Sequence, residues 1–195
     1  MEHKLAVYLE KRFSNCTERT ELEKVKMIYG LEILMDNMFK LLAIIVLGMV
    51  LGIFKETMCA FCGFGILRIK AGGFHCETNK MCWLVSVFCS VGNAYIANEV
   101  VLPLSVGIAL SAMCILLIGR YAPSGTLRNP INECDRGKRR RDSLLLTVSY
   151  VIVAMIGWKM AFARALLFGV VAETITILPW VNRKYRNRIT ESVAA

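Results

Sequence analysis

Three long runs without a charged residue constrain this chain more than any other feature. They cover residues 81–98, 100–119 and 143–158. A helix needs about 17–25 mostly apolar residues to cross the hydrocarbon core of a bilayer. The first two runs are long enough alone, and the third is long enough if it continues past Lys159 to Ala163. We therefore expect a polytopic membrane protein.

Two shorter charge-free runs, 41–54 and 57–67, qualify as spans if flanking residues are recruited and Lys40 or Lys55 snorkels to the interface. A chain of 195 residues that is 56% hydrophobic supplies the apolar surface for this. The sequence thus predicts an all-α integral membrane protein with about six transmembrane helices. The expected spans lie near residues 38–54, 56–68, 82–98, 100–119, 143–162 and 165–181.

The first 37 residues are dense in charge and lack the apolar core of a secretory signal. Apolar residues recur at helical spacing from Leu5 to Phe13, and Thr20 with Glu23 forms a capping box for a second helix. We expect two amphipathic helices lying at the membrane interface, with guidance of a substrate as the alternative role. The predicted organisation is a single membrane domain over 1–195, with amphipathic helices in 1–37, the bundle in 38–181 and a basic tail in 182–195.

Basic residues are distributed unequally between the two sides of this six-span arrangement. Of the 24 Lys and Arg residues, 21 fall on one side and only Lys55, Lys159 and Arg164 on the other. By the positive-inside rule, both termini and the 69–81 loop face the cytoplasm.

The 120–142 loop contains turn-forming residues and a run of basic residues from Arg136 to Arg141. Such a run usually fixes topology and contacts anionic lipid, and a dock for an acidic peptide is the alternative. Nucleic acid is not an expected partner, because no aromatic residues interleave with these charges.

The segment between the second and third expected spans carries the candidate chemistry. It holds His75, one of two histidines, together with Cys76, Cys82 and a Gly72-Gly73 pair. A thiol beside an imidazole is a nucleophile with its base. Residues seven apart on one helix are separated by about 10.5 Å along the axis, so a working dyad needs either a break between His75 and Cys82 or His75 on a loop that folds back toward Cys82. The glycines make that loop plausible, and Cys82 in the first turn of a helix would be favoured as thiolate by the helix dipole.

Other interpretations of these cysteines remain open at the level of sequence. His75, Cys76, Glu77 and Cys82 are ligand types that suit zinc, although their spacing matches no usual structural site. We expect no metal and no other cofactor. The Cys59-x-x-Cys62 pair lies within an expected span, where free cysteines usually behave as small hydrophobes.

Glu173 lies within the sixth expected span, and an acid at membrane depth is a functional candidate by default. The simpler explanation is an ion pair with a cation such as Arg164 or Lys159.

Several of these residues together resemble the accessory gene regulator B (AgrB) family, the membrane peptidases of quorum sensing. The core of the resemblance is Arg68-x-x-Ala-Gly-Gly-x-His75, followed seven residues later by Cys82. The match extends over nearly the whole chain in length and hydropathy pattern. Weaker matches are Tyr29-Gly30-Leu31-Glu32, Tyr121-Ala122-Pro123 and Asn129-Pro130-Ile131.

The resemblance implies a cysteine endopeptidase that cleaves the C-terminal tail from an AgrD-type precursor peptide. Cys82 would be the nucleophile and His75 the base, with Arg68, Gly72 and Gly73 supporting the site or binding substrate. The signal segment would remain as an acyl-thioester on Cys82, and an internal Cys or Ser would close a thiolactone or lactone ring. The family has alanine after the histidine, so Cys76 is a departure that puts a second thiol beside the base.

The resemblance also implies partners and a location. These are the precursor peptide and membrane lipid, with room for a homodimer, in the plasma membrane of a Gram-positive bacterium. Two other functions compete: a small multispan transporter or exporter of peptides without proteolytic chemistry, and a membrane scaffold or receptor. A transporter would require paired intramembrane charges and helices broken at mid-depth.

The unequal charge distribution makes a topological prediction. Single cysteines replacing Asn79 and Gly125, in a chain otherwise freed of cysteine, should react in intact cells only with a membrane-permeant maleimide. Both positions are expected on the cytoplasmic side. Efficient labelling of either position by an impermeant maleimide would contradict the six-span arrangement.

Overall fold

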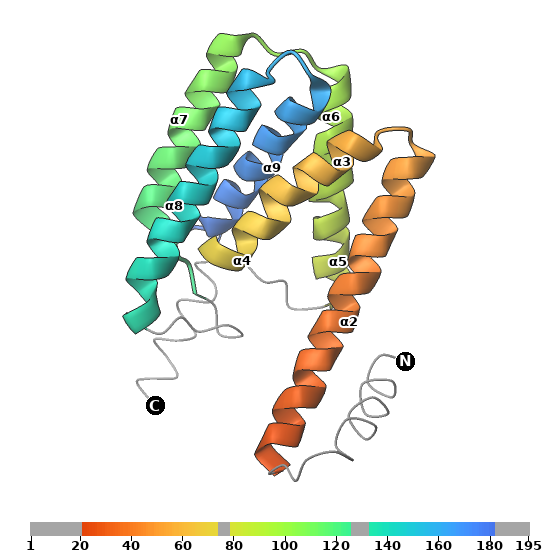
Figure 1. Cartoon of the computed structure of the whole chain (residues 1–195), viewed down its shortest axis with the longest axis vertical. Helices are drawn as coiled ribbons and strands as arrows, with labels where there is room; N and C mark the ends of the chain where they lie inside the picture. Colours follow the sequence, from red (N-terminus) through yellow and green to blue (C-terminus); the bar gives the residue numbers. More distant parts are fainter. Residues whose placement is uncertain (1–20, 74–78, 126–132, 182–195) are drawn as a thin grey trace. The chain divides into compact units, whose positions relative to one another are not determined.

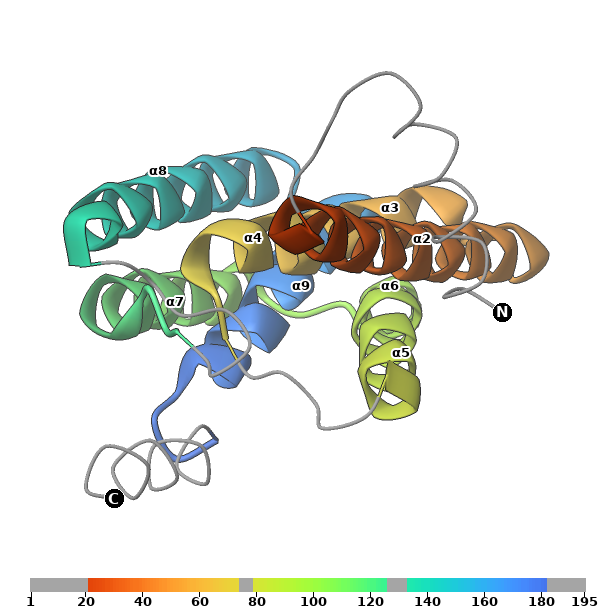
Figure 2. The same cartoon turned by 90° about the horizontal axis from the view of Figure 1, so that it is seen from below.

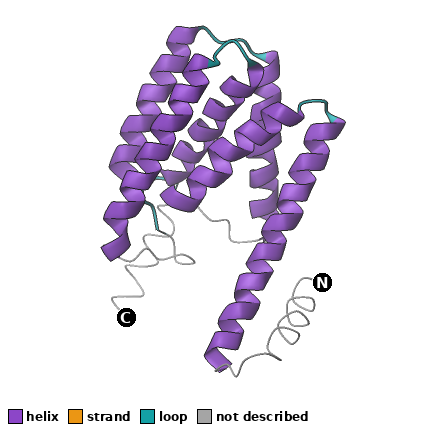
Figure 3. Cartoon of the chain, in the orientation of Figure 1, coloured by secondary structure: helices purple, strands orange, loops and turns teal. Residues whose placement is uncertain are grey.

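The described part of the chain is helical throughout, apart from one isolated β-bridge between Gly72 and Ser124 (Figures 1 and 3). The structure is a computed structural model that describes residues 21–73, 79–125 and 133–181. The predicted all-α class is therefore confirmed. The helices are α2 (Glu21–Val50), α3 (Phe54–Phe61), the π-helix η1 (Cys62–Ile66), α4 (Leu67–Ala71), α5 (Asn79–Val87), the π-helix η2 (Phe88–Gly92), α6 (Asn93–Glu99), α7 (Leu104–Tyr121), α8 (Glu133–Ile156) and α9 (Ala161–Ile177).

Six helical segments occupy the positions of the six expected spans, because η1 joins α3 to α4 and η2 joins α5 to α6 without a break. Within the described ranges, three helices are long and apolar enough to cross a membrane: Glu23–Val50, Met81–Glu99 and Leu104–Tyr121. The other three segments fall short for identifiable reasons. Charged residues occupy both ends of the 54–71 segment and the first turns of α8, while α9 has only 17 residues. The number of spans therefore stays a prediction.

The longest helix, α2, differs from the expected arrangement. It begins at Glu21, directly after the expected capping residue, and runs 30 residues to Val50. The second amphipathic helix and the first span are thus one continuous helix. The chain divides into a unit of residues 1–43 and a unit of residues 44–195, with the boundary inside α2. The expected first helix and the basic tail lie outside the described residues.

Within the first unit, Lys40 forms an ion pair with Asp36, one turn earlier on the same face of α2. The lysine side chain is only 9% exposed. This i, i+4 pair keeps the ammonium group bonded beside a long apolar stretch.

Within the second unit, α9 lies at the centre, and α3, α6, α7 and α8 all contact it (Figure 2). Eight consecutive residues of α9, from Ala163 to Val170, are buried. A helix that is buried on every face must be surrounded by other elements. The core of this unit is therefore organised around α9.

Large apolar side chains on the outer helices remain uncovered. Phe88, Leu116 and Ile156 are 74%, 73% and 84% exposed. Exposed apolar area on this scale is costly in water and is the normal surface of a protein in lipid. The exposure pattern agrees with the apolar runs of the sequence.

A close backbone contact joins α3 and η1 to α9 at two glycines. A Cβ atom on Gly63 would collide with the carbonyl oxygen of Leu166, and one on Gly169 would collide with that of Ala60. Small residues let two helix backbones approach this closely, as is typical of membrane helix pairs. The contact sets the position of α4, which continues directly from η1.

Loops gather at two opposite ends of the second unit (Figure 1). Residues 51–53, 100–103 and 157–160 lie at one end, while residues 72–73, 122–125 and the end of α9 lie at the other. Successive loops thus lie at alternate ends of the unit, as they must when consecutive spans are antiparallel. This alternation does not depend on which end faces the cytoplasm, so that orientation stays a prediction.

The glycine contact makes a stability prediction. Gly169→Ala should lower the melting temperature of the detergent-purified protein, because overpacking a tight contact typically costs about 1–3 kcal/mol. Gly137→Ala is the matched control, since nothing lies within 4 Å of the Cβ position there. The control should leave the melting temperature unchanged or raise it, because alanine is the better helix former. Equal melting temperatures for Gly169→Ala and the parent chain would mean that the two helices can separate at no cost.

Candidate functional site

Cys82 is the fourth residue of α5, so it lies in the first turn of that helix, as the sequence predicted. The residue is partly buried. Its carbonyl oxygen accepts a hydrogen bond from Ser86 Oγ at 2.8 Å, one turn further along. The expected base, His75, and the neighbouring thiol of Cys76 lie outside the described residues.

The glycine pair before His75 is held in a fixed turn. Gly72 has φ +74° and Gly73 has φ +122°, values that favour glycine. Gly73 N donates to the carbonyl oxygen of Ser124 at 3.1 Å, and Ser124 N donates to that of Ala71 at 2.8 Å. A Cβ atom on Gly72 would collide with the Ser124 backbone. The glycines that made a loop plausible thus begin it as a turn that contacts the 122–125 segment.

Arg68 forms the electrostatic centre of this end of the bundle. Its Nη1 lies 3.3 Å from Glu173 Oε2 and 3.5 Å from Thr176 Oγ1 on α9. The guanidinium also lies 5.5 Å from the centroid of the Phe64 ring. The arginine is thus held from one side by an aromatic face and from another by a carboxylate.

Glu173 is completely buried. Its Oε2 atom also accepts a hydrogen bond from Thr176 Oγ1 at 3.0 Å, whereas its Oε1 atom is buried without a hydrogen-bond partner. A Cβ atom on Gly73 would lie 3.1 Å from that Oε1 and 2.6 Å from Thr176 Oγ1. Glycine at position 73 is therefore required by its contact with α9.

The expected partners of Glu173 are corrected by this geometry. Arg164 lies at the opposite end of α9, where its guanidinium donates to the carbonyl oxygens of Ala97, Trp158 and Lys159 at 3.0–3.3 Å. It satisfies the ends of two helices instead of pairing with an acid. The cation that pairs with Glu173 is Arg68, which lies 105 residues away in sequence.

Sequence reasoning missed Thr176 and Ser124. Thr176 follows Glu173 by three residues, a spacing that puts both side chains on one helix face and could have been noticed. Ser124 acts through its backbone, so its side chain gave no signal.

No group of three or more His, Cys, Asp or Glu side chains within the described ranges could hold a metal ion. Of the four residues considered as zinc ligands, only Cys82 belongs to those ranges. Cys59 and Cys62 are free thiols on α3 and η1.

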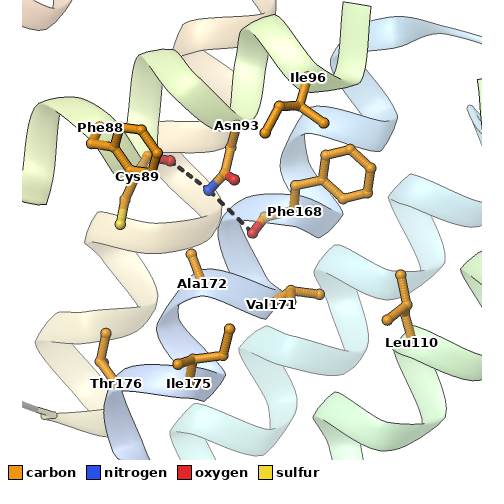
Figure 4. A pocket seen from close by; sticks show the side chains of 10 residues that line it. All are labelled: Phe88, Cys89, Asn93, Ile96, Leu110, Phe168, Val171, Ala172, Ile175 and Thr176. Carbon is orange, nitrogen blue, oxygen red and sulfur yellow. Dashed lines mark hydrogen bonds between the residues drawn. The ribbon is translucent and has the colours of Figure 1, made fainter. Parts of the chain in front are cut away.

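An apolar groove adjoins this polar cluster (Figure 4). One wall comes from Phe88, Cys89, Asn93 and Ile96, and the other from residues of α9 that include Phe168 and Thr176. Its volume is about 420 Å³, which lies within the range of small-molecule sites. Thr176 belongs to both the groove and the Arg68–Glu173 cluster.

Comparison with known proteins identifies the family. The model of the family described as Accessory gene regulator B matches residues 2–177. The chain belongs to the AgrB family. The resemblance found in the sequence is thereby confirmed.

Two relatives cover most of the chain. The Accessory gene regulator protein B of Staphylococcus aureus is 25% identical over 174 residues, which are 89% of this chain and 90% of that protein. An AgrB-like protein of Clostridium acetobutylicum is 25% identical over 189 residues, 94% of this chain and 90% of its own length.

A third relative is longer than this chain. Protein FsrB of Enterococcus faecalis is 29% identical over 153 residues, which are 77% of this chain but only 63% of FsrB. No solved structure is significantly similar to the chain.

Membership of the AgrB family and the three apolar helices together establish a membrane protein. The matched region contains Arg68, the glycine pair, Cys82 and Glu173. The fixed turn and the ion pair described above are therefore features of the AgrB-family portion of the chain.

The Arg68–Glu173 pair makes a second stability prediction. Arg68→Met should be the more damaging single change, because it leaves a fully buried carboxylate without its cation, a loss of roughly 3–5 kcal/mol. Glu173→Met should cost less, since the Arg68 side chain is 19% exposed. The double variant, Arg68→Met with Glu173→Met, should regain much of the stability that Arg68→Met loses. Melting temperatures of the four proteins in detergent would measure this.

The exposed pair between Lys70 and Asp142, with N and O atoms 3.5 Å apart, provides the control. Lys70→Met should change stability by only about 0–1 kcal/mol. Strictly additive losses in the double variant would contradict a direct interaction between Arg68 and Glu173.

Proposed function

We propose that this chain is a membrane cysteine endopeptidase of quorum sensing that cleaves an AgrD-type precursor peptide. The observation that carries the proposal is the position of Cys82. It lies in the first turn of α5, at the end of the bundle where Arg68 and the glycine pair are fixed. Only five residues, 74–78, separate the fixed turn from α5, and His75 is among them.

The proposed reaction is an acyl transfer. His75 accepts the proton of the Cys82 thiol, and the sulfur attacks the carbonyl carbon at the end of the signal segment. The C–N bond breaks, and His75 returns the proton to the departing amine of the C-terminal tail. The signal segment is then held as a thioester, to which a Cys or Ser within the same peptide transfers the acyl group. This closes a thiolactone or lactone and regenerates the Cys82 thiol. The thioester conserves the energy of the cut bond, so no nucleotide is needed.

Arg68, Gly72 and Gly73 take supporting roles in this proposal. The guanidinium of Arg68 is a fixed cation at the mouth of the groove, able to bind a carbonyl or carboxylate of the peptide. The glycine pair sets the direction in which the chain leaves α4 toward His75. Neither glycine can be replaced without displacing a neighbouring backbone or α9 side chain.

Charge favours a precursor with an acidic tail. Arg120 lies in the last turn of α7, and Arg136 and the run from Lys138 to Arg141 lie in the first turns of α8, at the same end of the bundle as the start of α5. Collectively these cations would attract an acidic tail and anionic lipid. With both termini and the catalytic loop in the cytoplasm of a Gram-positive bacterium, the tail would be released there.

The competing transporter function has one feature in its favour, the buried charge pair Arg68–Glu173. Transporters place such charges at mid-depth, beside broken helices. Here Arg68 lies four residues before Gly72, at which α4 ends, and Glu173 lies in the last turns of α9. The π-helices η1 and η2 leave their helices continuous. We therefore favour the peptidase.

Cys82→Ala should abolish cleavage of the precursor, because it removes the thiol that the proposed reaction uses as nucleophile. Cys76→Ala is the matched control and should retain much of the activity. Mass spectrometry of the precursor co-expressed with each variant gives the measurement. Full cleavage by Cys82→Ala would contradict the assignment of Cys82 as nucleophile. Normal peptide export without cleavage would favour the transporter function.

A further inference from the structure

The groove beside the Arg68–Glu173 cluster has no role in the proposed chemistry. It lies between the continuous α5–η2–α6 segment and α9, and Leu110 of α7 closes one side (Figure 4). It begins at Thr176 in the last turn of α9 and extends inward to Ile96 and Phe168. One end of the groove therefore meets the polar cluster through Thr176, and the other end lies between α6 and the middle of α9.

Cys82 stands on the helical segment that forms one wall of this groove. Phe88 and Cys89 follow Cys82 by six and seven residues, which is about 9–10.5 Å along a helix. Cys89 shares a helix face with Cys82 at this spacing. An extended peptide advances about 3.3–3.6 Å per residue, so about three residues would reach from the Cys82 sulfur into the groove.

One polar group in the groove distinguishes a peptide from a lipid chain. The amide nitrogen of Asn93 donates to the carbonyl oxygens of Cys89 at 2.7 Å and Phe168 at 3.4 Å. Its amide oxygen accepts no hydrogen bond from any residue in the described ranges. An acceptor without a donor is costly in an apolar environment. A peptide backbone supplies an N–H group, whereas an acyl chain supplies none.

Charge determines which side of the cleaved bond enters the groove. The basic residues of α7 and α8 lie outside the groove, beyond the polar cluster, and suit the acidic leaving tail. The groove is apolar apart from Asn93 and Thr176. An apolar segment must therefore lie on the acyl side, where it stays attached to Cys82.

We propose that this groove is the subsite for an apolar side chain of the precursor, about three residues from the cleaved bond on its acyl side. The backbone N–H of that segment donates to Asn93 Oδ1. The proposal deepens the proposed function and rests on Cys82 as nucleophile for the identity of the bound segment. It makes Asn93 and Ala172 determinants of peptide specificity.

Binding is tested separately from cleavage by photo-crosslinking. The full chain with Cys82→Ala, in phosphatidylglycerol nanodiscs, is mixed with an AgrD-type precursor. The precursor carries benzoylphenylalanine at one of the five acyl-side positions before the cleaved bond. We expect crosslinks to groove residues chiefly from the third position. Crosslinks to groove residues would support peptide binding in the groove even if the parent chain failed to cleave the precursor. Failure of the parent chain to cleave would overturn only the proposed peptidase function.

Specificity is tested with Ala172→Phe, which fills the groove. It should lower kcat/KM at least about 10-fold for a precursor with a large apolar residue at the crosslinking position. A precursor with alanine at that position should regain most of the lost kcat/KM with Ala172→Phe. A misfolded protein would not show this recovery. Ala109→Phe, the same change on the exposed face of α7, should leave kcat/KM unchanged for both precursors.

Two results would overturn the inference while leaving the peptidase intact. The first is cleavage by Ala172→Phe that is equally slow for both precursors, with crosslinks only outside the groove. The second is a photoreactive lipid that labels the groove residues and is not displaced by excess precursor, which would make the groove a lipid site.

Discussion

The backbone contact between η1 and α9 is the constraint on which the rest of the site depends. Gly63 and Gly169 let the two helices touch, and both helices leave the contact toward the same end of the bundle (Figure 1). Five residues later on one chain segment comes Arg68, and four residues later on the other comes Glu173. The ion pair is therefore the direct result of a helix contact that has no side chains at its centre. The glycine turn and the groove are both built against the same face of α9.

The helices of this fold could be predicted from the sequence because charged residues bound each apolar run, including the two shorter runs 41–54 and 57–67. Cys82 at a helix start followed from the boundary between a polar loop and an apolar run. Glu173 stood out as an acid at membrane depth, but its partner was wrongly expected on its own helix or the preceding loop. Local spacing cannot report that α4 crosses α9. Likewise, Gly72 and Gly73 made a loop plausible, but nothing in the local sequence indicates their contacts with Ser124 and α9.

Polar atoms at depth explain much of the remaining architecture. At one end of α9, the Arg164 guanidinium satisfies carbonyl oxygens at helix ends, and at the other the Glu173 carboxylate holds Arg68. Asn93 performs a similar task between η2 and α9. In lipid, every such group needs a partner inside the protein. Among the described residues, three side-chain oxygens are buried without a hydrogen-bond partner, and they belong to Thr57, Ser90 and Glu173. The one on Glu173 faces the glycine turn at Gly73.

The link between Gly72 and Ser124 is made entirely by backbone atoms. Position 72 must be glycine to permit it, but any residue with a free N–H could stand at position 124. Evolution can therefore exchange the side chain at 124 without a compensating change at 72. A contact of this kind leaves no trace in paired substitutions between homologues. Methods that infer contacts from covariation would miss the connection that ties the start of the His75 segment to the entrance of the basic loop.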